Sequence, residues 1–234
     1  MLPQIVVMAG GLGTRLGGAY SNIPKILAPV NGKPFLVLQL EKLISEGARR
    51  IHYLLGHKSD QVISLLLDLR LPIELSFSVE PPELLGTGGG LMNSVEELDD
   101  EFLLTYGDSY LIAEIDSVFS RMRNISFSNI MCVTYNLDQE SSPNVILSTP
   151  RVIGYSKQNC DIRNNALDYG LMKFRKESLM GFIPQSRNYD LEQIFNFLIE
   201  NENLYSLTVN EGYFDIGSPS RLKRLEEYLS ENTG

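Results

Sequence analysis

The chain has 234 residues, 43% of them hydrophobic, and a formal net charge of -9. This length and composition predict a domain large enough to bury a substantial core. The acidic balance argues against a nucleic acid or an anionic membrane as a partner, because both would repel the chain. Any phosphate-bearing substrate must therefore be held by local cations or by a metal.

The sequence shows neither a membrane span nor a secretion signal. No apolar run approaches the roughly 20 residues that cross a bilayer, and a glycine-rich turn follows the N-terminus before a signal peptide could be completed. Cys132 lies in an apolar segment and Cys160 in a polar one, without the CxxC spacing of a redox or zinc motif. We expect a cytoplasmic protein with two reduced thiols.

Strands and helices are expected to alternate over the first 136 residues. A strand at 4–8 leads into the glycine turn, and a helix with an apolar face begins at Pro34 and ends at Gly47. This order predicts an α/β fold of the Rossmann-like type, with a mostly parallel sheet and helices on both faces. Further strands are expected at 51–55, 73–79, 102–107 and 129–136, and further helices at 59–68, 88–97 and 114–124.

The alternation stops between about 138 and 170. Short β segments at 144–148, 151–156 and 166–173 are separated by polar residues, which predicts a small antiparallel β insertion packed beside the first half. Two helices are expected after it. Asp190 begins one with a capping box, and Ser218 and Pro219 begin the last.

The most informative segment is 8–29, MAGGLGTRLGGAYSNIPKILAP. Its glycines let backbone N–H groups approach phosphate oxygens, and Arg15 and Lys25 supply positive charge. The dinucleotide fingerprint is incomplete, because Leu16 occupies its last glycine position and no acidic residue ends the second strand. A Walker loop fails because no Gly-Lys-Ser/Thr follows. The segment predicts a nucleoside triphosphate site of another type.

Four separated motifs resemble those of the sugar-phosphate nucleotidyltransferase family. They are GGLGTRL with a downstream PK (10–16 and 24–25), LGTGG (85–89), YGD (106–108) and FDIGSP (214–219). The resemblance implies a GT-A-like nucleotidyltransferase fold over a single domain, 1–234. In that domain 1–137 form the nucleotide-binding half and 138–234 the sugar-binding half.

The resemblance also implies a reaction. An oxygen of a sugar 1-phosphate attacks the α-phosphorus of a nucleoside triphosphate, which gives a nucleotide-sugar and pyrophosphate. A phosphate monoester has a second pKa near 6, so the nucleophile is already largely an anion at neutral pH and needs no side-chain base. Neither His52 nor His57 is therefore expected to be catalytic.

Site residues follow from the matching motif positions. The resemblance implies Arg15, Lys25 and Asp108 as catalytic residues and Asp108 and Asp215 as ligands of Mg²⁺, which prefers oxygen ligands. The sugar contacts are less well defined, because Ser156 stands where relatives often carry Glu. The implied nucleotide-binding residues are Ala9, Gly10, Gly11, Gly13, Thr14, Arg15, Glu80, Gly86, Thr87 and Gly88. The implied sugar-phosphate-binding residues are Lys25, Lys157, Asp168, Tyr169 and Gly170.

Glu80 favours guanine as the base. A carboxylate can accept two hydrogen bonds from the adjacent N1–H and N2–H groups of guanine, but it faces the oxygens of a pyrimidine unfavourably. The motifs look most like those of bacterial heptose 1-phosphate and mannose 1-phosphate guanylyltransferases. The expected substrates are thus GTP and a sugar 1-phosphate, and a homodimer remains open.

Other readings remain. The base could be cytosine, uracil or thymine, or the acceptor could be a non-sugar phosphate such as phosphocholine, used with CTP. A catalytically silent regulatory homologue that binds a nucleotide-sugar is a reading from another class. The presence of Arg15, Lys25, Asp108 and Asp215 argues for an active enzyme, because silent relatives usually lose one of these residues.

Overall fold

The structure is a computed structural model that describes residues 1–11, 23–81, 83, 85–135, 142–157, 165–184 and 186–232. Gly13, Thr14, Arg15 and Cys160, which carry predictions from the sequence, lie outside the described residues. Within the described ranges, no helix is both long enough and apolar enough to cross a membrane. Cys132 is a buried free thiol.

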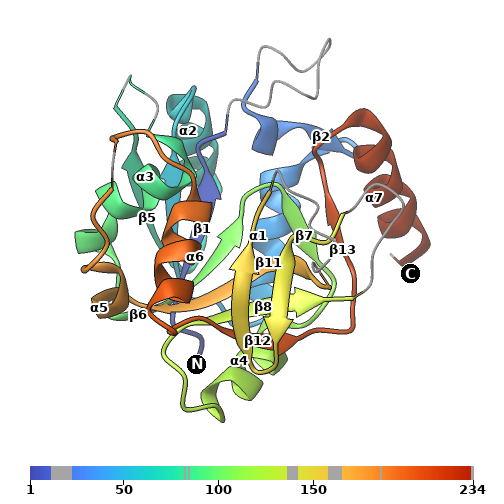
Figure 1. The fold of residues 1–234 in the computed structure, drawn as a ribbon. Helices are drawn as coiled ribbons and strands as arrows, with labels where there is room; N and C mark the ends of the chain where they lie inside the picture. Colours follow the sequence, from blue (N-terminus) through green and yellow to red (C-terminus); the bar gives the residue numbers. More distant parts are fainter. Residues whose placement is uncertain are drawn as a thin grey trace.

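A nine-stranded mixed sheet forms the centre of the molecule (Figure 1), in the order β5-β4-β1-β6-β11-β8-β12-β10-β9. β1 pairs in parallel with β4 and β6, β4 pairs in parallel with β5, and β8 pairs in parallel with β12. The strands are β1 (Gln4–Ala9), β4 (Arg50–Leu55), β5 (Glu74–Val79), β6 (Glu101–Tyr106), β8 (Ile130–Thr134), β9 (Val145–Ser148), β10 (Arg151–Tyr155), β11 (Leu167–Arg175) and β12 (Tyr205–Thr208).

The α/β fold with antiparallel additions is confirmed, but the antiparallel strands are placed differently from the expectation. β9, β10 and β11 do not pack beside the first half as a separate insertion; they belong to the central sheet. β11 lies between β6 and β8 and is antiparallel to both. Its nine residues are buried except for Arg175, because both faces of this central strand are covered.

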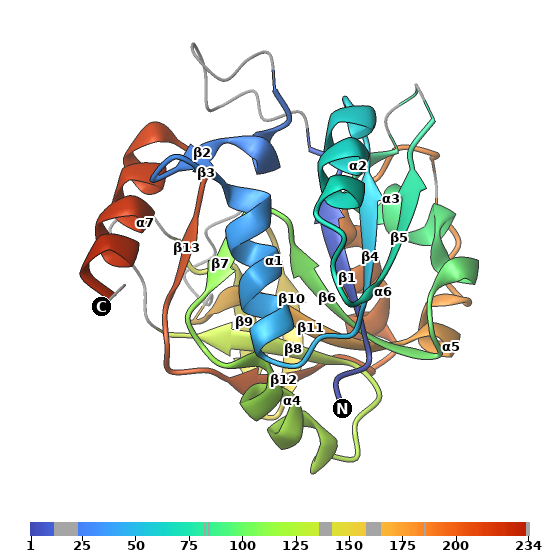
Figure 2. The ribbon, with the colours of Figure 1, turned by 180° about the vertical axis from the view of Figure 1, so that it is seen from behind.

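Helices cover both faces of the sheet. Figure 2 shows α1, α2 and α4 over one face, and Figure 1 shows α3 and α6 over the other. Each face has its own hydrophobic core, one built around Phe35, Ile51 and Phe119 and the other around Phe102, Phe174 and Phe195. The helices are α1 (Phe35–Ser45), α2 (Ser59–Asp68), α3 (Gly86–Asn93), α4 (Ile115–Arg123), α5 (Lys176–Leu179), α6 (Leu191–Glu200) and α7 (Pro219–Asn232), with 3-10 turns at Lys25–Leu27 and Val95–Glu97.

Two small antiparallel sheets connect α7 to the rest of the fold. β2 (Pro29–Val30) pairs with β3 (Lys33–Pro34), and β7 (Ser109–Leu111) pairs with β13 (Tyr213–Asp215). α7 packs against β13 and β2. The register of the second sheet places Asp215 opposite Ser109. A C-terminal segment is thereby brought to the residue that follows Asp108.

The carboxyl ends of the parallel strands meet at one edge of the sheet. Gly107 N–H donates to the Met8 carbonyl over 2.8 Å, which extends the pairing of β6 with β1 beyond the strands themselves. A Cβ at Gly107 would lie 2.7 Å from that carbonyl oxygen. The close approach therefore requires glycine, and it places Asp108 beside the start of the glycine turn.

Candidate active site

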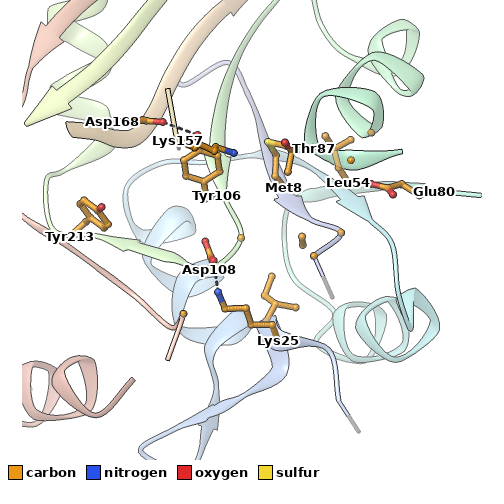
Figure 3. A pocket seen from close by; sticks show the side chains of 18 of the residues that line it. Met8, Lys25, Leu54, Glu80, Thr87, Tyr106, Asp108, Lys157, Asp168 and Tyr213 are labelled. Atoms are coloured by element: carbon orange, nitrogen blue, oxygen red, sulfur yellow. Dashed lines mark hydrogen bonds and ion pairs between the residues drawn. The ribbon is translucent and has the colours of Figure 1, made fainter. Parts of the chain in front are cut away.

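A cavity of about 540 Å³ opens at this edge of the sheet. Lys25 and Asp108 lie at one side of it, Glu80 at a second and Asp168 with Lys157 at a third (Figure 3). We call it the main cavity. A neighbouring cavity of about 320 Å³ shares Lys25, Asp108 and Asp168 with it and adds Asp215 and Arg221. This edge is where ligands of open α/β sheets collect.

Lys25 and Asp108 form an ion pair. Lys25 Nζ donates to Asp108 Oδ2 over 2.5 Å, and the lysine side chain is only 15% exposed. Lys25 starts the 3-10 turn that follows Pro24, whereas Asp108 follows the end of β6. Two residues predicted from separate motifs are therefore in direct contact.

Asp215 lies in the neighbouring cavity and is held by its own segment. Its Oδ1 accepts the Gly217 N–H over 2.7 Å, and its Oδ2 pairs with Arg221 of α7. A Cβ added at Gly217 would lie 2.6 Å from Asp215 Oδ1 and 3.8 Å from Lys25 Nζ. The close approach of the Asp215 carboxylate therefore requires glycine at position 217.

The two aspartates suit Mg²⁺ in the chemistry of their donors. Both offer carboxylate oxygens to the same small cavity. Among the described residues, no group of three or more His, Cys, Asp or Glu side chains could enclose a metal by itself. Mg²⁺ is commonly bound by one or two carboxylates together with substrate phosphates and water. The residues present fit that mode of binding.

Gln39 holds the turn that carries Asp108. Its Nε2 donates to the carbonyls of Tyr106 and Ser109, over 2.9 and 2.8 Å. These two carbonyls flank Gly107 and Asp108, and Gln39 itself is buried in α1. Sequence reasoning missed this residue, because a glutamine within an apolar helical face carries no motif. The only local signal is a polar residue at a core position.

Glu80 packs between two glycines. A Cβ at Gly10 would lie 2.9 Å from Glu80 Oε1, and a Cβ at Gly90 would lie 2.7 Å from the same atom. Glu80 Oε2 accepts the Leu85 N–H over 3.2 Å. Burial raises the pKa of the Glu80 carboxyl above its ordinary value, although the Leu85 N–H acts in the opposite direction.

Asp168 is a buried carboxylate at the far side of the main cavity. Its Oδ2 accepts the hydroxyls of Tyr106 and Tyr155 over 2.8 and 3.3 Å, and its Oδ1 accepts the Gly170 N–H over 2.8 Å. Burial raises the pKa of Asp168, and these three donors oppose that shift. The β11 pairing with β8 is irregular between Asp168 and Met172, and Gly170 has a φ of +84°. The irregularity turns the carboxylate into the cavity.

Lys157 pairs with the residue that caps α6. Its Nζ lies 2.7 and 3.0 Å from the two carboxylate oxygens of Asp190. Asp190 Oδ1 also accepts the Glu192 N–H, as a helix N-cap does. Burial acts to raise the pKa of Asp190, but the Lys157 ammonium and the Glu192 N–H hold it below its ordinary value.

Two of the predicted residues have packing roles in the structure. Tyr169 is buried in the core, where its hydroxyl accepts the Ala113 N–H and donates to the Gly212 carbonyl. That hydroxyl is therefore already engaged, and the residue borders the neighbouring cavity alongside Gly170. Gly88 is absent from the described lining of the main cavity; its N–H donates to the Tyr189 carbonyl.

Most of the other described predictions lie together. Ala9, Gly10, Gly11, Gly86 and Thr87 line the main cavity. Sequence reasoning missed Tyr106, Tyr155, Asn144 and Gly90 as lining residues. It also missed Arg221 in the neighbouring cavity. Tyr106 stood within the YGD motif and Gly90 directly after LGTGG, so both had a nearby signal.

The comparison with protein families matches residues 5–150 to the MobA-like NTP transferase domain. The chain belongs to this family. The match spans more than half of the chain, and it includes β1, the glycine turn, Lys25, Glu80 and Asp108. It confirms the resemblance to sugar-phosphate nucleotidyltransferases.

This nucleotidyltransferase is similar to two curated D-glycero-alpha-D-manno-heptose 1-phosphate guanylyltransferases. The protein from Campylobacter jejuni is 31% identical over 115 residues, which cover 49% of this chain and 52% of the relative. The alignment therefore spans about half the length of that relative. The protein from Aneurinibacillus thermoaerophilus is 23% identical over 231 residues, which cover 97% of this chain and 98% of the relative.

Solved structures share the fold of this nucleotidyltransferase. HddC from Yersinia pseudotuberculosis, solved in complex with GMP-PN, superposes with a TM-score of 0.79 at 24% identity, over 97% of this chain and 100% of that one. A glucose-1-phosphate thymidylyltransferase described as putative, from Bacillus anthracis, superposes with a TM-score of 0.83 at 17% identity, over 99% and 96% of the two chains. Relatives with different named bases thus have this architecture, so the fold leaves base specificity to individual side chains.

Proposed function

We propose that the protein is a Mg²⁺-dependent sugar 1-phosphate guanylyltransferase that makes a GDP-sugar, with heptose 1-phosphate or mannose 1-phosphate as the acceptor. The observation that carries this proposal is the arrangement of three groups around the main cavity. Lys25 and Asp108 lie at one side of it, Glu80 at a second, and Asp168 with Lys157 at a third. The phosphate chain, the base and the sugar of the two substrates each require one such region.

In the proposed reaction, an oxygen of the sugar 1-phosphate forms a bond to the α-phosphorus of GTP. The bond from that phosphorus to the oxygen bridging to the β-phosphorus breaks, and pyrophosphate leaves with the electron pair. No proton has to be removed from the ionised nucleophile. The barrier lies in bringing two polyanions together, so cationic contacts are the main requirement.

Lys25 is placed to supply one of these cationic contacts. The Lys25 residue borders both cavities. Its ammonium can therefore neutralise charge on the transferred phosphoryl group. Arg15 is proposed as a second contact, on the pyrophosphate side. Asp108 and Asp215 would hold Mg²⁺, which the family typically uses and which supplies charge stabilisation on the phosphate oxygens.

Glu80 supports guanine as the base. Its carboxylate is fixed by the Leu85 N–H and by the two glycines packed against it, and it lines the main cavity. Guanine can offer two parallel N–H donors to a carboxylate. The names of the curated guanylyltransferase relatives agree with this assignment.

The sugar is proposed to bind between Asp168 and Lys157. Asp168 is oriented by two tyrosine hydroxyls, so its carboxylate can accept a bond from a sugar hydroxyl. Lys157 is 37% exposed on its side chain and borders the main cavity, so it can reach a phosphate or a hydroxyl. Asp190 holds Lys157 in place through an ion pair.

The test is a product screen with the purified chain. GTP, ATP, CTP, UTP and dTTP are each incubated with Mg²⁺ and either a member of a panel of sugar 1-phosphates or phosphocholine, and pyrophosphate release and product mass are measured. We expect a GDP-sugar from GTP with heptose or mannose 1-phosphate. Product from UTP, dTTP or CTP with none from GTP would overturn the base assignment. Product from CTP and phosphocholine alone would overturn the sugar assignment.

A matched pair of lysine variants controls the screen. Lys25→Met removes the ammonium beside Asp108. Lys33→Met removes a lysine that pairs with Glu41 over 2.5 Å on the surface, where both side chains are exposed. We expect turnover to fall at least about 100-fold in the first variant, as with other transition-state charge contacts, and less than twofold in the second. Equal turnover in the two variants would remove Lys25 from the mechanism.

A further inference from the structure

A third cavity lies at the opposite edge of the sheet, where β6 begins and β11 ends. Its volume is about 320 Å³, and its charged lining residues are Glu101, Arg123, Lys173 and Arg175. Residues 125–128, between α4 and β8, complete the wall. We call it the cationic cavity. Its lining shares no described residue with the two cavities of the candidate active site.

This cavity and the candidate active site lie at opposite ends of β6. The register pairs Arg175 with Glu101 at the first residue of β6, whereas Asp108 follows the last residue of that strand. Six residues of extended strand span roughly 17 Å. A ligand here would therefore be distinct from the nucleotide and the sugar.

Lys173 is the most buried cation of the cationic cavity. Its side chain is 6% exposed, and its ion pair with Glu101 is 3.8 Å long between Nζ and Oε2. That distance is longer than a direct hydrogen bond. Burial lowers the pKa of Lys173, and the Glu101 carboxylate opposes this shift. A buried ammonium with so distant a counter-ion is costly, and a closer anion would reduce that cost.

Two arginines add to the positive charge. Arg175 has an ion pair of 3.8 Å with Glu177 and a side chain that is 51% exposed. Arg123 lies in the last turn of α4, where the helix dipole favours a cation. The helix dipole explains why a cation stands at position 123, but it does not explain why Lys173 and Arg175 line the same cavity. The chain as a whole has a net charge of -9, but three of the four charged residues that line this cavity are cations.

The chemistry of this lining favours phosphate. Guanidinium groups form paired hydrogen bonds with phosphate oxygens, and an ammonium is a compact point charge for the same oxygens. Ser126 and Ser128 also line the wall and carry hydroxyl donors. We propose that the cationic cavity binds a phosphate-bearing anion, with Arg123, Lys173 and Arg175 as its contacts. The proposal does not depend on the nucleotide or sugar assigned above.

The test is a titration of the isotope-labelled full chain, followed by amide chemical shifts in NMR spectra. Inorganic phosphate and pyrophosphate are the probes, at constant ionic strength set with chloride. We expect saturable shifts at residues 123–128 and 173–175, with a dissociation constant on the order of 1 mM. Tighter binding of pyrophosphate would assign a diphosphate ligand, and equal affinity a single phosphoryl group; either result supports the proposal.

Three variants sharpen the test. Arg123→Gln and Arg175→Gln should each weaken binding about tenfold, because each removes a charge-assisted contact. Glu101→Gln should strengthen binding severalfold, because it removes the carboxylate from the wall. Arg151→Gln, which changes an exposed arginine paired with Glu202, serves as the control and should leave the affinity unchanged.

Several results would overturn the proposal. These are no saturable shift at 123–128 or 173–175, shifts reproduced by chloride alone, or affinities that stay the same in both arginine variants. Shifts at residues 8–11 and 107 report the candidate active site separately, so phosphate binding there cannot be mistaken for binding in the cationic cavity. Failure of the product screen would leave this result untouched.

Discussion

Lys25 Nζ lies 2.5 Å from Asp108 Oδ2 at one side of the main cavity. The sequence assigned the first residue to phosphate and the second to metal, yet in the structure the two neutralise each other. In the proposed reaction, a triphosphate bound with Mg²⁺ would offer a new partner to each of them. Substrate binding is therefore expected to exchange this ion pair for two separate contacts.

Replacing Asp108 with Asn should abolish turnover with little effect on stability. The change removes the carboxylate charge at nearly constant volume, and we expect kcat/KM to fall at least about 100-fold. The ion pair is partly exposed to solvent, so the free energy of unfolding should change by no more than about 1 kcal/mol. Pyrophosphate release and thermal melting measure the two effects. Asp100→Asn, at an exposed position, is the control, and undiminished turnover in Asp108→Asn would refute the metal assignment.

Gln39 is expected to act as a positioning residue. Gln39→Leu leaves the carbonyls of Tyr106 and Ser109 without their donor, which should cost about 2–4 kcal/mol of unfolding free energy. If the turn then shifts Asp108, kcat should fall more than KM rises. Steady-state kinetics and denaturant unfolding test this, with exposed Gln61→Leu as the control. A variant that is less stable but keeps the full kcat would show that Gln39 acts on folding alone.

Glu80→Gln should reduce the preference for GTP. A glutamine has one acceptor and one donor group where the carboxylate has two acceptors, so kcat/KM for GTP should fall at least about tenfold relative to UTP or dTTP. Competition between nucleotides in one reaction measures the ratio. The same preference in both proteins would separate Glu80 from base recognition.

The pH dependence of the stability of Glu80→Gln tests the pKa shift of Glu80 independently of the kinetics. The folded-state pKa of Glu80 is raised above its ordinary value of 4.5, chiefly by burial. Protonation of Glu80 thus contributes stability below about pH 4.5, and this contribution is lost as the pH rises through the folded-state pKa. Thermal melting across that range should show Glu80→Gln gaining stability relative to the parent protein as the pH increases. A constant difference would contradict the shift.

Asp168→Asn should affect the sugar phosphate more than the nucleotide. Asn can still accept the Gly170 N–H, and Tyr106 can reverse its hydroxyl, so the free energy of unfolding should change by less than about 2 kcal/mol. We expect KM for the sugar 1-phosphate to rise about tenfold while KM for the nucleoside triphosphate stays within twofold. Kinetics with each substrate varied in turn provide the measurement, and an equal rise in both KM values would remove Asp168 from the sugar region.

The sequence by itself determined the local elements and most of the chemistry. Hydrophobic periodicity predicted the helix at 59–68 with the bounds that the structure shows, and the Asp190 capping box predicted the start of α6. Periodicity and capping succeed because they depend on neighbours within a few residues. The separated motifs likewise named Lys25 and Asp108, and the hydrogen-bonding chemistry of its carboxylate singled out Glu80; all three residues line the main cavity.

Only the tertiary structure decided how distant segments combine. β11 joins the central sheet between β6 and β8, and β13 brings Asp215 to β7. Strand pairing of this kind depends on which exposed edges and apolar faces remain after the rest of the chain has packed, and no local pattern records that. The same holds for Gln39, which acts on carbonyls far along the chain. The sequence determined which groups are available, and global packing determined which of them meet.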